Sequence, residues 1–315
     1  MLIQILLLVI GILGLWFSAE IVIRSAQVVA HKLKISETFI GLTILSIGTT
    51  LPELGTHIIS SIRILHGQNL SDLAVSMNVG SNLIQITAIL GIVALFMKVK
   101  SDKKFLDGDY IVMLLSIFLL FVLGYNGIIT RLEGAFLMIC YLLYIWSLGR
   151  AEHFVEKIEN NIGRKKLTLY FIGIPAGILL LLISSELTVM NAHFLAGKWG
   201  VADTFIGALV LGLGTALPEL AAAIVAIRRK SEEMSIGVLV GSNITNPLFG
   251  IGLGAVISTY TISDTILWLD IPAWFFVSIV VLLFFWRKLQ LERKEAIMMI
   301  ACYVAYVALK FKFMA

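Results

Sequence analysis

Two glutamates follow proline inside long apolar stretches of the sequence. Glu53 ends the segment GTTLPE and Glu219 ends the segment GTALPE. Proline lacks an amide donor and clashes with the preceding turn, so we expect each helix to break there and to free carbonyls near Ser46 and Gly212. Carbonyl, hydroxyl and carboxylate oxygens suit Ca²⁺ or Na⁺. The alternative is a pair of protonated, hydrogen-bonded structural glutamates.

Neutral polar side chains accompany both glutamates, and they could complete a cation site. These candidate ligands are Thr49, Thr50, Thr215, Ser81, Ser242, Gln85 and Asn246. Gln85 follows Ser81 by four residues, and Asn246 follows Ser242 by four, so each amide shares a helix face with its serine. The alternative is that the serines and amides make only hydrogen bonds between helices.

Other polar residues in apolar stretches have simpler explanations. Arg24 lies one helical turn after Glu20, which predicts an ion pair, whereas Met190 lies one turn after Glu186 and offers no such partner. His57 is expected to be a buried hydrogen-bonding residue. The sequence contains no Cys/His metal cluster, nucleotide loop, nucleophile elbow or HExxH motif. We therefore expect no cofactor and no enzymatic activity.

The composition is that of a membrane protein. Of the 315 residues, 59% are hydrophobic and 14% are charged, and the mean hydropathy is +0.98. A span needs about 20 apolar residues. By this criterion the sequence predicts ten transmembrane helices, the first retained and not a signal peptide. The predicted spans are 2–30, 38–62, 73–97, 110–124, 132–149, 168–196, 204–227, 234–257, 265–286 and 295–313.

The basic residues divide unequally between the two sides of these spans. The odd-numbered loops contain 18 of the 24 lysines and arginines, and the opposite side contains 5. Basic residues mark the cytoplasmic side. We therefore expect both termini outside the cell (inner or plasma) membrane and the charged segment Arg150–Lys166 in the cytoplasm.

The two halves of the sequence repeat each other. Residues 18–54 match residues 184–220, and the shared segments include FIG, GT and LPEL. VGSN at Val79–Asn82 recurs at Val240–Asn243. Five spans per copy is an odd number, so the second copy enters the membrane inverted, as in many transporters. The expected organisation is an all-α fold with broken helices 2 and 7. A first five-helix repeat spans residues 1–149, with its motif region near 41–91. A cytoplasmic linker at 150–167 leads to the second five-helix repeat at 168–315, with its motif region near 207–254.

The repeated motifs resemble the two alpha-repeats of the calcium/cation antiporter superfamily, most closely the prokaryotic sodium/calcium exchangers. These motifs are GTTLPE with VGSN in the first copy and GTALPE with VGSN in the second. The resemblance implies ten helices, with ions bound where helices two, three, seven and eight meet. It implies exchange of Ca²⁺ against Na⁺ by alternating access, with helices one and six sliding across the core.

Carried over to this sequence, the resemblance makes Glu53 and Glu219 the central Ca²⁺ ligands. Thr49, Thr215, Ser81 and Ser242 would supply hydroxyls, and Ser46 and Gly212 backbone carbonyls. Two departures stand out. Gln85 and Asn246 are both amides where the family usually has one aspartate, and Ala216 replaces a serine.

We therefore expect a secondary cation antiporter, Ca²⁺/Na⁺ in the leading interpretation and Ca²⁺/H⁺ or another cation/H⁺ antiporter in the alternative. An intramembrane enzyme would need a catalytic constellation that the sequence lacks. A channel or a purely structural protein is the third class. The expected partners are inorganic cations and the lipid bilayer, with no nucleic acid, and a monomer is expected.

Overall fold

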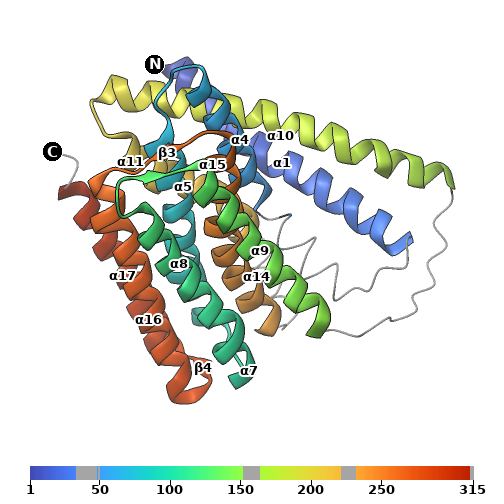
Figure 1. Ribbon diagram of the computed structural model, residues 1–315. Helices are drawn as coiled ribbons and strands as arrows, with labels where there is room; N and C mark the ends of the chain where they lie inside the picture. Colours follow the sequence, from blue (N-terminus) through green and yellow to red (C-terminus); the bar gives the residue numbers. More distant parts are fainter. Residues whose placement is uncertain (33–47, 49, 152–163, 221–231, 313–315) are drawn as a thin grey trace.

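The chain folds into a bundle of helices with two very short sheets (Figure 1). The computed structural model describes residues 1–32, 48, 50–151, 164–220 and 232–312. Predicted ligands Ser46 and Thr49, most of the Arg150–Lys166 segment and the start of the predicted second span lie outside the described residues. The expectation of an all-helical class is confirmed.

The first half contains α1 (Leu2–Lys32), α4 (Leu51–Leu65), α5 (Ser71–Ile84), the π-helical turn η2 (Gln85–Ile89), α6 (Leu90–Phe96), α7 (Lys103–Phe105), η3 (Leu106–Tyr110), α8 (Ile111–Gly124) and α9 (Arg131–Ala151). The second half contains α10 (Arg164–Trp199), α11 (Asp203–Phe205), η4 (Ile206–Leu211), α12 (Gly212–Thr215), α14 (Glu232–Thr245), η5 (Asn246–Ile251), α15 (Gly252–Ile257), η6 (Ile266–Asp270), α16 (Ile271–Lys288) and α17 (Arg293–Lys312).

Eight helical stretches of the described residues are long and apolar enough to cross a membrane. They are Leu2–Val22, Ser71–Phe96, Lys103–Gly124, Arg131–Leu148, Ile172–Trp199, Asp203–Leu220, Ile236–Ile257 and Ile266–Lys288. Each coincides with one of the ten predicted spans. Of the other two predictions, 38–62 is described mainly through α4, and 295–313 corresponds to α17, which is not among the eight.

Two of these stretches form the centre of the bundle. In Ser71–Phe96 and in Ile236–Ile257, 78% of the most apolar window is buried, against 17% in Arg131–Leu148. The α5 helix packs directly on the backbone of the second half, because a Cβ atom at Gly80 would lie 2.2 Å from the carbonyl oxygen of Ala208. A Cβ at Gly212 would lie 2.8 Å from the amide nitrogen of Ser81. Glycine at these positions allows the two halves to meet at backbone distance.

The α1 and α10 helices run side by side and lie obliquely to the bundle formed by α8, α9, α16 and α17 (Figure 1). Small residues line their contact. Gly11 and Gly14 face Thr188 and Ser184, and Gly173 faces Ser25. Small residues at these positions let the two helices pack closely against each other.

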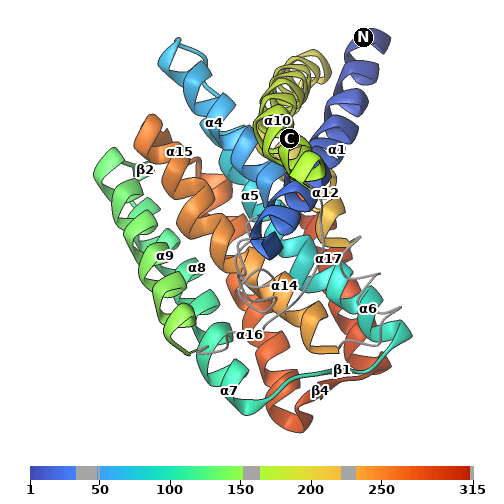
Figure 2. The same cartoon turned by 90° about the vertical axis from the view of Figure 1, so that its right-hand side faces the viewer.

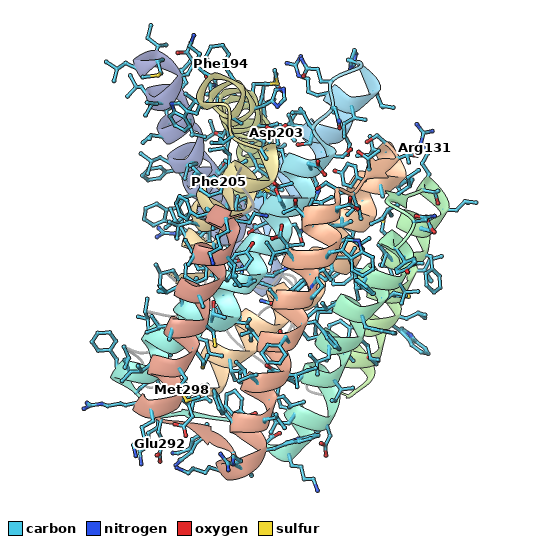
Figure 3. All side chains as sticks on the ribbon, turned by 90° about the vertical axis from the view of Figure 1, so that its left-hand side faces the viewer. Arg131, Phe194, Asp203, Phe205, Glu292 and Met298 are labelled. Atoms are coloured by element: carbon cyan, nitrogen blue, oxygen red, sulfur yellow. The ribbon has the colours of Figure 1, made fainter. Side chains whose placement is uncertain are left out.

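The short strands, and the π-helical turns η2 with η5 and η3 with η6, occur at matching places in the two halves. Strand β1 (Val99–Lys100) pairs with β4 (Gln290–Leu291), and β2 (Ile128–Ile129) pairs with β3 (Tyr260–Thr261), both antiparallel. Each sheet therefore joins one strand from each half. The β1–β4 pair lies at one end of the bundle (Figure 2), whereas β3 lies at the other end, near α11 (Figure 1). Figure 3 labels Asp203 and Phe205 of α11 at that end and Glu292 at the opposite end.

Only some of the ion pairs in the structure were predicted from the sequence. The predicted pair between Glu20 and Arg24 is present. Glu186, which has Met190 and no basic partner one turn along its own helix, bonds instead to Arg63 of α4, with Nε 3.3 Å from Oε2. This partner comes from another helix, which spacing within one helix could not reveal. Lys310, which falls inside the predicted span 295–313, is buried and pairs with buried Asp270 at 2.5 Å.

Candidate cation site between the two halves

Glu53 enters the bundle at the start of a helix. Helix α4 begins at Leu51 after Thr50, and Pro52 lies in its first turn, where the missing amide donor costs no helical hydrogen bond. The carboxylate of Glu53 therefore lies in the first turn of α4, where the helix dipole favours negative charge. Both Thr50 and Glu53 are fully buried.

The Glu53 carboxylate connects α4 to α5 and to the second half. The Ser81 hydroxyl donates to Glu53 Oε1 at 2.7 Å. The Thr215 hydroxyl also interacts with the Glu53 carboxyl group. Oε2 is buried and accepts no well-formed hydrogen bond from the residues that the structure describes. Predicted ligands from both halves thus meet at one carboxylate.

Glu219 occupies the matching position in the second half. Helix α12 ends at Thr215, Ala216 forms a turn, and residues 217–220 are helical again. The Ser242 hydroxyl, from α14, donates to Glu219 Oε1 at 3.2 Å, and Glu219 is fully buried. Each glutamate is therefore held by the serine that the repeated VGSN segment places on the neighbouring helix.

The predicted free carbonyl at Gly212 is not free. Its oxygen accepts the amide of Ala216 at 3.2 Å and lies 3.5 Å from the Thr215 hydroxyl. This expectation was wrong by half a turn, because proline removes the donor to the carbonyl four residues earlier, which for Pro218 is Gly214. A carbonyl oxygen has two lone pairs, so the Gly212 oxygen can still accept one further contact.

Gln85 and Asn246 each begin a π-helical turn, η2 and η5, inside an otherwise α-helical span. Such turns often occur at functional sites. Both side chains are buried, but they do not both present an oxygen as the sequence suggested. Gln85 donates from Nε2 to Ser81 Oγ at 3.1 Å, and its oxygen accepts from Asn243 at 2.9 Å. Asn246 donates to Asn82 at 2.9 Å, and its own Oδ1 accepts no bond from the described residues.

The residues that surround these amides were not among the predicted ligands. Asn82 and Asn243 contact the predicted ligands directly, and both stand in the repeated VGSN segments, where the signal was visible. Trp274 donates to Asn243 at 2.9 Å, and Asn78 lies 3.0 Å from His57. Those contacts depend on which helices face each other, which a single sequence does not reveal. His57 is a buried hydrogen-bonding residue, as predicted.

An ionised carboxylate at mid-depth in a membrane costs at least about 2.5–3.5 kcal/mol on insertion scales. Both buried glutamates accept from serine hydroxyls, and Glu53 also lies in the first turn of α4. A bound cation would neutralise such buried carboxylates. Among the described residues, no group of three or more His, Cys, Asp and Glu gathers to hold a metal ion. Oxygen ligands of this kind are those that hard cations such as Ca²⁺ prefer.

Comparison with known proteins places the chain in a family. The family model for "Sodium/calcium exchanger protein" matches residues 3–149 and 169–312. The inner membrane protein YrbG of Escherichia coli is 30% identical over 91% of this chain and 90% of its own length. The sodium/calcium exchanger MaX1 of Methanosarcina acetivorans is 27% identical over 97% of this chain and 98% of its own.

A solved structure of the sodium-calcium exchanger NCX_Mj, soaked with 10 mM Na⁺ and no Ca²⁺, has the same fold. It superimposes with a TM-score of 0.68 and 22% identity over 98% of each chain. The fold, the apolar helices and the family match together describe a multi-pass membrane protein. The chain belongs to the sodium/calcium exchanger family.

Proposed function

We propose that this protein is a secondary active antiporter that exchanges Ca²⁺ against Na⁺ by alternating access. The observation behind the proposal is the pairing of Glu53 with Ser81 and of Glu219 with Ser242, with Thr215 of the second half on the carboxyl group of Glu53. The names of MaX1 and NCX_Mj as sodium/calcium exchangers support the choice of ions. The ions are transported substrates, and the proposal requires no cofactor and no enzymatic step.

The proposed architecture has ten transmembrane helices in two inverted repeats, 1–149 and 168–315, with broken helices 2 and 7 and a cytoplasmic linker at 150–167. The paired strands, which join β1 to β4 and β2 to β3, support an inverted relation. The turn at Ala216 and the start of α4 at Leu51 support the two breaks. Both termini lie outside the cell membrane in this proposal, and the protein acts as a monomer.

The packing of α1 on α10 supports alternating access. Gly11, Gly14 and Gly173 let the two helices approach closely along this contact, so that they can move as one unit. A pair of helices that moves together could then expose the central site first to one side and then to the other. Gly55 of α4 also contacts α10, through Ser185 and Leu181, which would couple such movement to the helix that bears Glu53.

Uptake of ⁴⁵Ca²⁺ into proteoliposomes under an imposed gradient tests the proposal. Vesicles loaded with Na⁺ and diluted into Na⁺-free buffer should accumulate ⁴⁵Ca²⁺, and K⁺-loaded vesicles should not. Accumulation driven by a proton gradient in the absence of Na⁺ would identify the cation/H⁺ alternative. Ca²⁺ entry that ignores both gradients would contradict antiport and indicate a channel.

A further inference from the structure

The orientation of the buried Asn78 amide is fixed by an atom that can only accept. Asn78 Nδ2 lies 3.1 Å from the backbone oxygen of Asn246, so the nitrogen end of the amide must face that carbonyl. The same nitrogen lies 3.0 Å from His57 Nε2. Because the Asn78 amide nitrogen can only donate hydrogen bonds, His57 Nε2 must accept and therefore bears no proton.

The tautomer of His57 also fixes the direction of its hydrogen bond to Tyr260. With Nε2 accepting, the ring proton lies on Nδ1, which is 3.1 Å from the Tyr260 hydroxyl. The Tyr260 hydroxyl lies 2.8 Å from Ser61 Oγ, and Ser61 donates to the backbone oxygen of Gly254 at 2.9 Å. Every side chain in this hydrogen-bonded chain is fully buried, so water does not compete for these hydrogen bonds.

In the other direction the same logic reaches Asn246. Asn78 has its nitrogen occupied, and its Oδ1 accepts from Asn82 Nδ2 at 3.2 Å. The Asn82 oxygen is therefore left to accept from Asn246 Nδ2 at 2.9 Å. Asn246 is 1% exposed, and its Oδ1 is the end of the amide that remains for another partner. Asn246 follows Ser242, which bonds Glu219, by one helical turn, so this oxygen belongs to the Glu219 side of the site.

In the first half the equivalent amide, Gln85, has the opposite orientation. The indole nitrogen of Trp274 is only a donor, so Asn243 must turn its oxygen toward it. Asn243 Nδ2 then donates to the backbone oxygen of Leu239 at 2.8 Å and to Gln85 Oε1 at 2.9 Å. The Gln85 oxygen is occupied, and its Nε2 faces Ser81, which in turn donates to Glu53.

We propose that His57, Asn78 and Asn82 are positioning residues that hold the Asn246 side-chain oxygen toward the transported cation. Gln85, held by Asn243, supports Ser81 as a donor and supplies no oxygen to the ion. This inference rests on the proposed function. It assigns unlike roles to two amides at equivalent positions, one as ligand and one as support.

Replacement of Asn82 by leucine, in two backgrounds, tests the proposal. Asn82→Leu removes the acceptor for Asn246 Nδ2 and lets the amide turn its N–H groups toward the ion. Equilibrium binding of ⁴⁵Ca²⁺ to purified protein should weaken about tenfold or more, as expected when a buried polar partner is lost. In an Asn246→Asp background both side-chain atoms are oxygens, orientation no longer matters, and Asn82→Leu should change affinity by less than about twofold. Asn191→Leu, in α10, is the matched control and should leave binding unchanged.

An equal loss of affinity in both backgrounds would show that Asn82 is merely structural and would overturn the proposal, as would no loss in the otherwise unchanged protein. The ¹⁵N NMR shifts of His57 give an independent readout, with the neutral Nδ1–H tautomer as the expected result. An Nε2–H tautomer or a doubly protonated ring would refute the orientation. The NMR result decides the orientation even if a leucine variant fails to fold. A protein that binds no Ca²⁺ at all would contradict the proposed function separately, and the tautomer would still be measured.

Discussion

Asn246 donates a hydrogen bond to Asn82 across the interface between α5 and the second half, at 2.9 Å. The residues at the equivalent positions of the other copy, Gln85 and Asn243, are joined at the same distance, but there the VGSN asparagine is the donor. The repeat therefore places a pair of side-chain amides at two equivalent positions, while the direction of the hydrogen bond differs between them. The two amides should consequently respond differently to the same change of charge.

Asn246→Asp should tighten Ca²⁺ binding, because it adds a negative charge at an oxygen that has no hydrogen-bond donor among the described residues. A unit charge about 4 Å from a cation contributes about 4 kcal/mol at an effective dielectric constant of 20, and desolvation offsets part of it. A tenfold gain in affinity, measured by isothermal titration calorimetry, is the expected scale.

Gln85→Glu is the matched comparison at the equivalent position. It removes the donor to Ser81 and brings a second carboxylate close to Glu53, so it should give a smaller gain and lower the melting temperature. Equal gains from the two variants would mean that both amides face the ion alike.

Gly80→Ala should destabilise the protein, because the new methyl group would lie 2.2 Å from the backbone oxygen of Ala208, which cannot move aside as a flexible side chain could. Overpacking of this kind typically costs about 1–3 kcal/mol. Thermal unfolding in detergent measures the effect. Gly237→Ala in α14 is the control, since its Cβ would meet nothing within 4 Å and should be tolerated. A Gly80→Ala protein as stable as the Gly237→Ala protein would refute the close contact.

The proposed topology rests on the distribution of 18 basic residues on one side against 5 on the other. Single cysteines at Gly67 and at Lys103, in a protein with Cys140 and Cys302 replaced by serine, should react differently with an impermeant maleimide applied to intact cells. Position 67 should be labelled from outside, because the loop after α4 lies on the sparsely basic side. Position 103 should require permeabilised cells. The reverse pattern would show that the orientation is inverted.

The sequence predicted the duplicated glutamates, their serines and most of the spans, because these follow from apolar length and from exact repetition of short motifs. It did not predict which side chains meet between helices. Glu186 pairs with Arg63 of another helix, and Lys310 pairs with Asp270 inside the bundle. Both contacts depend on helix rotation and depth, which a periodic apolar pattern leaves undetermined.

The direction of the amide hydrogen bonds was equally beyond the sequence. Asparagine and glutamine can each donate and accept, so their roles become definite only beside a one-way partner such as the Trp274 indole or the Asn246 carbonyl. Pro247 indicated a local distortion next to Asn246, but the π-helical form of the turns at Gln85 and Asn246 was not predicted.

The central claim is that Glu53 and Glu219 together bind one transported Ca²⁺. Glu53→Gln and Glu219→Gln keep an oxygen that can accept from Ser81 and Ser242, so both variants should fold. Each removes a charge that the ion needs, and the loss of one carboxylate from a low-dielectric site is expected to weaken binding more than a hundredfold, or about 3 kcal/mol. Glu133→Gln, whose side chain caps Thr130 away from this site, is the matched control.

The most direct measurement is Na⁺-gradient-driven ⁴⁵Ca²⁺ uptake by proteoliposomes that contain each variant at equal, folded amounts. The account predicts uptake at background level for both site variants and normal uptake for Glu133→Gln. Robust gradient-driven exchange by either Glu53→Gln or Glu219→Gln would contradict the two-glutamate site.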